Sequence, residues 1–204
     1  NLSDYISFNQ TISDVVDHNY DSYYDMYNQY TKILDPMLSS LKYFHSDINQ
    51  VTIYVNKDIV EHDTTIAPSS HIKNEDWYSR LSGNSNIHWL VSKEDESAFS
   101  VRNMPSLQAD SSIGTLYINV DYNKLFESFK NMKDLNYGIF IIDENGKEIF
   151  EYSIFDDDNS SMELTYNDYL GENNKLLKKK YSIVGCSSDT ESWTVVLYKP
   201  VTLI

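Results

Sequence analysis

The chain has 204 residues, which is enough for one large domain or two small ones. Hydrophobic residues make up 41% of it and charged residues 23%, a mixture typical of a globular protein and not of a disordered one. The formal net charge of −15 argues against nucleic acid as a partner, because binding nucleic acid requires a basic surface. The single cysteine, Cys186, excludes an internal disulfide.

The first 48 residues carry helical periodicity. From Val16 to Ile48, apolar residues recur in steps of three and four, and no glycine interrupts them. This pattern predicts a long N-terminal helix over 1–48, about 70 Å in length, with a kink near Pro36. Such a helix packs on its own domain, forms a stalk that pairs with a second copy, or does both. Its seam is rich in tyrosine and too polar for a strong coiled coil, so we expect a weak parallel homodimer.

After Ile48 the pattern changes to alternation, which is typical of strands. The segment 49–132 is predicted to form one domain of several strands, a short helix over Glu75–Leu81 and a linker helix that begins at Tyr122. The segment 133–204 is predicted to form a second, smaller sheet, with the boundary in Asn131–Asn136. The expected fold class is therefore α+β: a long N-terminal helix followed by two antiparallel-sheet domains.

The second domain has strand signals on both sides of the turn Asp143–Gly146 and two more near the end of the chain, Lys179–Val184 and Trp193–Tyr198. The basic run Lys178–Lys180 is expected at a solvated strand edge, where lysines discourage pairing with other sheets.

Motifs for catalysis and for cofactors are absent from the sequence. It has no nucleophile elbow, no phosphate-binding glycine loop and no zinc-protease motif. The run Glu61–Asp63 could bind a metal, but we expect it to be a solvated hairpin end. The acidic run that begins at Asp156 lacks the glycine and the glutamate of a calcium loop. We therefore predict no catalytic residue, no metal and no cofactor.

Taken in order, several short motifs resemble the double Cache sensor module, a pair of PAS-like domains found in bacterial receptors. The nearest likeness is to the extracellular part of YesM-like sensor histidine kinases. The motifs that carry it are Ile53-Tyr54-Val55, Asp76-Trp77-Tyr78, Ile87-His88-Trp89-Leu90, Ser100-Val101-Arg102-Asn103, Ile113–Val120, Phe140–Gly146 and Ser192–Pro200.

The resemblance implies a membrane receptor with this module outside the cell, between two transmembrane helices that flank the present sequence. It places a ligand in the larger, membrane-distal domain, between the sheet and the segment bearing the Trp-Tyr pair. Amino-acid-binding members have an arginine two residues before that tryptophan and an aspartate on the strand after Ile-Gly. Here these positions are Glu75 and Asn119, which argues against a free amino acid, since both counter-charges are missing.

Each candidate ligand-binding residue could also have an ordinary role in the hydrophobic core. Trp77 is expected in the core, and Tyr78 is as well suited to a pocket wall as to the core. Trp89 suits core packing, and Arg102 in an apolar strand needs an anion, either a protein carboxylate or a ligand. Tyr117 and Asn119 share a strand face, and a buried amide there needs partners that a polar ligand could supply. Tyr54 is the weakest candidate.

We therefore expect an extracellular sensor domain of a two-component histidine kinase that binds a small polar molecule, with a saccharide as the suggested class. The alternatives are the Cache input domain of a chemoreceptor or other membrane-bound regulator, and an extracellular interaction module without a ligand. The fragment itself is not expected to be an enzyme, whereas the whole protein is expected to be a kinase.

Overall fold

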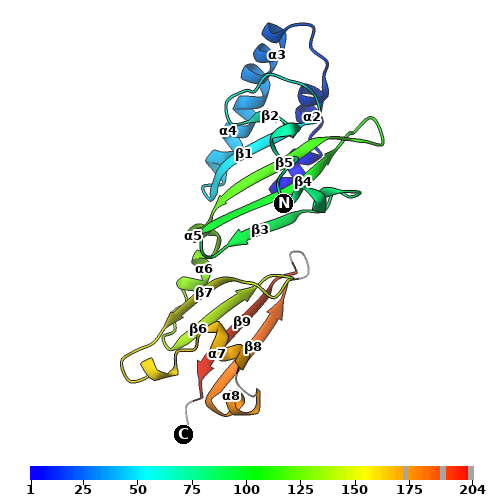
Figure 1. Ribbon diagram of the computed structural model, residues 1–204. Coiled ribbons are helices and arrows are strands. Elements are labelled where there is room, and N and C mark those ends of the chain that lie inside the picture. Colours follow the sequence, from blue (N-terminus) through cyan, green and yellow to red (C-terminus); the bar gives the residue numbers. More distant parts are fainter. Residues whose placement is uncertain (172–173, 189–191, 202–204) are drawn as a thin grey trace. The chain divides into compact units, whose positions relative to one another are not determined.

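The computed structural model describes residues 1–171, 174–188 and 192–201, and it divides into two compact units (Figure 1). Unit 1 contains Asn1–Leu90 and Ser97–Asp121, and unit 2 contains Val91–Glu96 and Tyr122–Ile204. Each unit has its own β-sheet and its own helices, so the predicted α+β class is confirmed. Among the described residues, none of the helices combines the length and the apolar character that crossing a bilayer requires.

The sheet of unit 1 has five strands in the order β2-β1-β5-β4-β3. Their bounds are β1 Ile48–Val55, β2 Ile66–Pro68, β3 His88–Ser92, β4 Ser97–Pro105 and β5 Ser112–Asp121. The central strand β5 pairs antiparallel with β1 and with β4, whereas the short strand β2 pairs parallel with β1.

The prediction of one continuous helix over residues 1–48 is wrong. The segment contains α1 (Leu2–Ser7), α2 (Gln10–Asp17), α3 (Tyr23–Gln29), a π-helical turn η1 (Tyr30–Leu34) and α4 (Asp35–Phe44). The chain breaks twice, where the side chains of Asn9 and Ser22 cap the backbone N–H groups of new helices. Only 23–44 runs on without a break, about 33 Å at 1.5 Å per residue. The π turn ends two residues before Pro36, which has no backbone N–H to donate.

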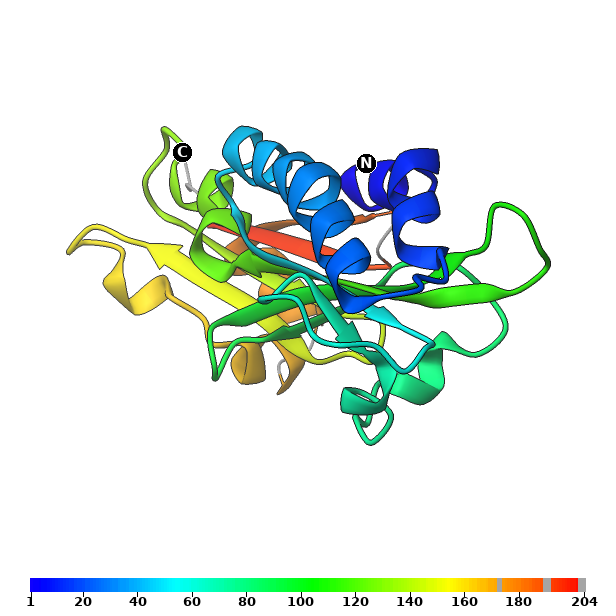
Figure 2. The same ribbon diagram turned by 90° about the horizontal axis from the view of Figure 1, so that it is seen from above.

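Helices α1–α4 cover one face of the five-stranded sheet, and the two 3₁₀ turns η2 (Ser69–His71) and η3 (Tyr78–Leu81) lie on the other side (Figure 2). The predicted helix over Glu75–Leu81 is thus a single 3₁₀ turn. The sheet residues under the helices are buried and apolar; they include Val51, Ile53, Val55, Leu116, Ile118 and Val120. This layer is the main core of unit 1.

The predicted apolar stripe on the N-terminal helices is correct only in part. The buried side chains on α3, η1 and α4 are Met26, Tyr30, Leu34 and Leu38, each four residues from the last. Tyr23 and Tyr27 also fall on the apolar spacing of three and four residues that begins at Val16, but they are 56% and 45% exposed. A π turn has more residues per turn than an α-helix, so a spacing of four residues stays on one face across it.

Unit 2 has a four-stranded antiparallel sheet in the order β7-β6-β9-β8. The strands are β6 Tyr137–Ile142, β7 Glu148–Ile154, β8 Tyr181–Ser187 and β9 Thr194–Pro200. The helices are α5 Tyr122–Leu125, α6 Glu127–Lys130, α7 Tyr166–Gly171 and α8 Asn174–Lys180, and a 3₁₀ turn, η4, lies at Ser160–Met162. One cluster in its core consists of Phe140, Leu164, Leu177, Tyr181, Val196 and Tyr198. The run Lys178–Lys180 was predicted at a strand edge, but it forms the last turn of α8. Cations are favourable there because a helix C-terminus carries a partial negative charge.

Gly138 on β6 predicts a test of this core. A Cβ atom at Gly138 would lie 2.1 Å from the Tyr198 ring, whereas one at Gly185 on β8 would meet nothing within 4 Å. We expect Gly138→Ala to destabilise the protein by about 1–3 kcal/mol, because the stacked Tyr198 ring must move. Gly185→Ala, the matched control in the same sheet, should change stability by less than about 0.5 kcal/mol. Urea unfolding of both variants measures the difference, and equal effects would show that Tyr198 is free to shift.

Candidate functional site

The face of the unit 1 sheet that lies away from the helices carries a cluster of aromatic side chains, which we call the aromatic face. It consists of Tyr54 on β1, Phe99 on β4, Tyr117 on β5, and Trp77 and Tyr78 at the start of η3. The ring of Tyr117 lies 5.0 Å from Phe99 and 6.2 Å edge-on from Tyr54, and Trp77 meets Phe99 edge-on at 6.0 Å, all between centroids. Sequence reasoning placed four of these five together and missed Phe99.

The five rings differ in how far they are buried. Trp77 is only 8% exposed and packs with Ile72, Leu81 and Val101, so the predicted core role is confirmed for it. Tyr54, Tyr78, Phe99 and Tyr117 are half-buried. Among the described residues, the hydroxyl groups of Tyr54 and Tyr78 have no hydrogen-bond partner. The aromatic face therefore combines apolar surface with polar groups whose bonding capacity is unused.

Asn119 lies at the edge of this face with its amide already engaged. Its Nδ2 donates to the Tyr117 hydroxyl at 3.2 Å, and its Oδ1 accepts from Asn49 Nδ2 at 3.0 Å. The partners expected from a polar ligand are thus supplied at least in part by the protein. This chain of three residues fixes the orientation of the Tyr117 hydroxyl.

The environment of Tyr54 disfavours its ionised form. Burial raises the pKa of the Tyr54 hydroxyl above its ordinary value, and the negatively charged carboxylates of Glu75 and Glu61 raise it further. The hydroxyl therefore remains a neutral donor and acceptor over the physiological range, which suits it to contact a polar solute.

His88 on β3 is a residue that sequence reasoning did not single out. Side chains alternate along a strand, so His88 shares a face with Leu90, which packs against the aromatic cluster. Its Nε2 atom is buried and has no hydrogen-bond partner among the described residues. A buried polar atom without a partner is costly. The two-residue spacing between His88 and Leu90 could have revealed from the sequence that both lie on the same face of the strand.

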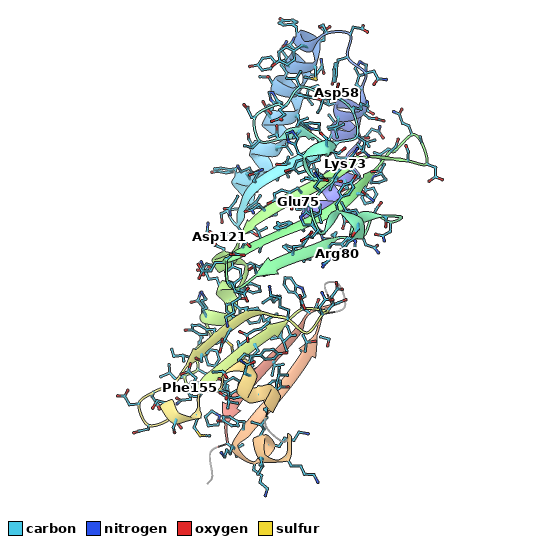
Figure 3. The ribbon with its side chains drawn as sticks, viewed as in Figure 1. Asp58, Lys73, Glu75, Arg80, Asp121 and Phe155 are labelled. Atoms are coloured by element: carbon cyan, nitrogen blue, oxygen red, sulfur yellow. The ribbon has the colours of Figure 1, made fainter. Side chains whose placement is uncertain are left out.

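A polar pocket of about 480 Å³ adjoins Tyr78 at one end of the aromatic face. Its lining residues are Asn56, Lys57, Asp58, Pro68, Ser69, Ser70, Lys73 and Tyr78. Lys57 is engaged with Asp17 of α2, at 3.4 Å between Nζ and Oδ1. Lys73 and Asp58 form no ion pair with the described residues. Both are labelled in Figure 3, together with Glu75 and Arg80.

Two predicted site residues lie elsewhere. Arg102 is 5% exposed and points into the helix-covered side, where its Nη1 donates to Asp4 Oδ1 of α1 at 2.6 Å. Its guanidinium also lies 5.3 Å from the centre of the Phe8 ring. The expectation that a protein carboxylate would neutralise Arg102 is confirmed. Trp89 is half-buried and, by strand alternation, faces away from Leu90 and the aromatic face.

We expect Asp4→Asn to destabilise the protein by about 1–3 kcal/mol, because the buried guanidinium of Arg102 would lose its counter-charge. The estimate is below that for a fully buried pair because Asp4 is half-exposed to water. Asp14→Asn on α2 is the control and should cost much less, because the Asp14 carboxylate accepts from the amides of Gln10 and Gln108 and forms no ion pair with the described residues. Thermal unfolding measures both, and equal losses would contradict a special role for the Arg102 pair.

The similarity of this chain to known proteins is one of fold. No family model matches the sequence, and no curated protein matches it. Among solved structures, the extracellular domain of vpHK1S-Z8, described as a histidine kinase, is similar with a TM-score of 0.58 and 14% identity, over 98% of this chain and 82% of that one. The sensor domain of the V. cholerae histidine kinase DctB is similar with a TM-score of 0.53 and 9% identity, over 99% and 88%.

The sensory domain of the Campylobacter jejuni chemoreceptor Tlp3, solved with isoleucine bound, is similar with a TM-score of 0.54 and 13% identity, over 98% of this chain and 85% of that one. The chain therefore has the fold of the extracellular sensor domains of bacterial histidine kinases and chemoreceptors. This confirms the Cache-type fold implied by the sequence resemblance. The nearer likeness to YesM-like kinases stays a prediction.

Proposed function

We propose that the chain is the extracellular ligand-sensing part of a bacterial membrane receptor and that it binds a small polar solute on the aromatic face of unit 1. The observation that carries the proposal is a half-buried set of aromatic rings with unused polar groups, namely the hydroxyls of Tyr54 and Tyr78 and the imidazole Nε2 of His88. Small-molecule sites combine apolar walls with a few convergent polar groups in this way. The fold shared with sensor domains supports the same reading.

A neutral solute, with saccharides as the first class to test, is our proposal for the ligand. Flat aromatic rings present apolar surface to a sugar ring, while hydroxyl, amide and imidazole groups can bond to its hydroxyls. Glu75 and Asn119 offer neither the arginine nor the aspartate that the family uses for amino acids. A zwitterionic amino acid is the alternative, favoured by Lys73 and Asp58 beside Tyr78 and by the isoleucine in Tlp3.

The remaining parts of the proposal concern the whole receptor. Residues 49–132 would form the membrane-distal ligand-binding domain and 133–204 the proximal one, with transmembrane helices on both sides of the sequence. The output would be a histidine kinase of a two-component system, and a chemoreceptor or another membrane-bound regulator is the alternative. This part of the chain would carry no catalytic step. Signalling would require a ligand to bind two receptor states with different affinity, typically by about 1–3 kcal/mol.

A ligand screen tests the binding proposal. We expect one class of compound, from panels of saccharides and amino acids, to raise the melting temperature of the domain, since a ligand at 100 times its dissociation constant adds about 2.7 kcal/mol. Tyr54→Phe removes one of the unused hydroxyls of the aromatic face and should weaken binding by about 5–10-fold. Tyr43→Phe, at an exposed position on α4, is the matched control and should bind as the wild type does.

Two outcomes would count against this proposal. If no compound stabilises the protein, the domain is an interaction module without a small ligand. If Tyr43→Phe weakens binding as much as Tyr54→Phe, the ligand binds away from the aromatic face.

A weak parallel homodimer through the N-terminal segment is also proposed. On α3 and α4 the residues Tyr23, Tyr24, Tyr27, Tyr43 and Phe44 are exposed. Exposed aromatic residues in such number are typical of a protein interface. We expect sedimentation equilibrium to show a monomer–dimer equilibrium that Tyr24→Glu shifts to monomer. Tyr5→Glu on α1 is the control for added charge, and an effect of equal size there would contradict the assignment to α3.

A further inference from the structure

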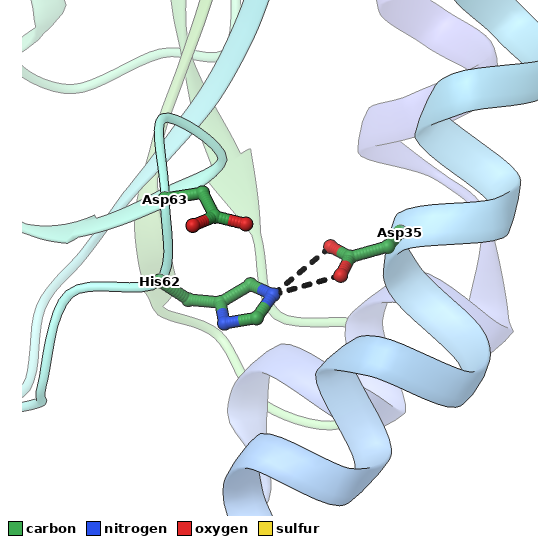
Figure 4. Close-up of side chains that lie close together, drawn as sticks. All are labelled: Asp35, His62 and Asp63. Carbon is green, nitrogen blue, oxygen red and sulfur yellow. Dashed lines mark hydrogen bonds and ion pairs between the residues drawn. The ribbon is translucent and has the colours of Figure 1, made fainter.

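Asp35, His62 and Asp63 lie close together in unit 1, at the place where α4 meets the connection between β1 and β2 (Figure 4). Each offers one atom of a type that binds metals, and these atoms all lie within 4.8 Å of one another. His62 is 6% exposed, so the prediction of a solvated hairpin end at 61–63 is wrong for this residue. The site is separate from the aromatic face and does not depend on the function proposed for it.

The positions of these atoms fit a shared ion. His62 Nε2 lies 2.9 and 3.1 Å from the two oxygens of Asp35. Ligand atoms bound at about 2.0–2.2 Å to a tetrahedral ion lie roughly 3.3–3.6 Å from one another, slightly farther apart than His62 and Asp35 are here. The carboxylate of Asp63 faces the same space (Figure 4). A small movement of the side chains would therefore allow all three to bind one ion.

Surrounding contacts hold His62 in place. Its backbone N–H donates to the carbonyl of Ile66 at 3.0 Å, and its own carbonyl accepts from Thr65 and Ile66. The rings of Tyr27 and Tyr30 lie 5.6 and 5.5 Å from the imidazole, measured between centroids. The imidazole is thus oriented before any ion binds, which lowers the entropic cost of binding.

The π turn η1 positions Asp35 at the site. The backbone N–H of Asp35 bonds to the carbonyl of Tyr30, five residues earlier, and α4 begins at Asp35 itself. A π turn inserts one residue into a helix and often occurs at a functional position. Here the insertion keeps Tyr30 and Leu34 buried while the following residue, Asp35, contacts His62.

We propose that Asp35, His62 and Asp63 form a binding site for a divalent transition-metal ion, with Zn²⁺ as the ion that fits best. One imidazole and two carboxylates favour Zn²⁺ over Ca²⁺, which prefers six or more oxygen ligands. With neutral His62 the three side chains carry a net charge of −2, which a divalent cation neutralises. Asp63 is exposed, so an ion can enter from solvent. A bound ion would tie α4 to the β1–β2 connection.

An ion pair between protonated His62 and Asp35 is the simpler reading of the same contact, and Asp63 distinguishes the two. Asp63 has no part in the pair, whereas a metal site needs it as the third ligand. We expect calorimetric titration to show that the wild-type chain binds one Zn²⁺ and that Asp63→Asn weakens binding by about tenfold or more. Co²⁺ should give visible absorption bands of low-symmetry coordination that are lost in the same variant.

The controls separate this site from chance binding to surface histidines. His62→Gln should abolish Zn²⁺ binding, whereas His71→Gln should not, because His71 is an exposed histidine paired with Glu61 at 3.1 Å. If His62→Gln fails to fold, Asp63→Asn decides the matter, because its side chain is on the surface and its folding can be checked by circular dichroism. The proposal is overturned if the wild type does not bind Zn²⁺, if Asp63→Asn binds it unchanged, or if His71→Gln loses it equally.

Discussion

The packing of the N-terminal helices on one face of the five-stranded sheet determines what the rest of unit 1 can do. Strand side chains alternate between the two faces, so each of β1, β4 and β5 sends every second residue under the helices. That side is packed with apolar side chains, and the buried guanidinium of Arg102 there is neutralised by Asp4. The intervening residues are left for the aromatic face.

The close approach of β1 and β5 brings together the two tyrosines of that face. Gly114 pairs with Val55, and a Cβ atom there would lie 2.2 Å from the carbonyl oxygen of Tyr54. Only glycine allows this approach, which is the reason for a glycine near the start of β5. The glycine thus lets the β1 backbone at Tyr54, one residue of the aromatic face, lie close to β5.

The sequence predicted the parts of this structure that depend on local pattern. The alternation in 51–55 and 113–120, and the pair Trp77–Tyr78, were enough to place the sheet and its aromatic cover. The prediction of a continuous N-terminal helix was wrong because the apolar periodicity was given more weight than the residues that cap helix N-termini. Asn9 and the Ser22–Asp25 pair, in which Ser22 Oγ accepts from Asp25 N at 3.1 Å, were readable stop-and-start signals.

Contacts between distant segments could not be predicted in the same way. Nothing near His62 in the sequence indicates that Asp35, 27 residues earlier, is its partner, because a π turn changes which helix residues face the sheet. Which of the 31 acidic residues neutralises Arg102 could not be predicted either, although the need for such a carboxylate followed from the burial of Arg102 alone. His88 could have been found from parity with Leu90, once β3 was assigned to the sheet.

The central claim is that a small solute binds against the aromatic face of unit 1, and tyrosine-specific NMR tests it most directly. The tyrosines would be labelled with fluorine, and the signals of Tyr54, Tyr78, Tyr117 and Tyr30 assigned from single Tyr→Phe variants. We predict that the compound giving the largest thermal shift moves the signals of Tyr54, Tyr78 and Tyr117 together and leaves that of Tyr30, buried on η1, unchanged. If only tyrosines of unit 2, such as Tyr166 and Tyr169, respond, the binding surface has been assigned to the wrong unit.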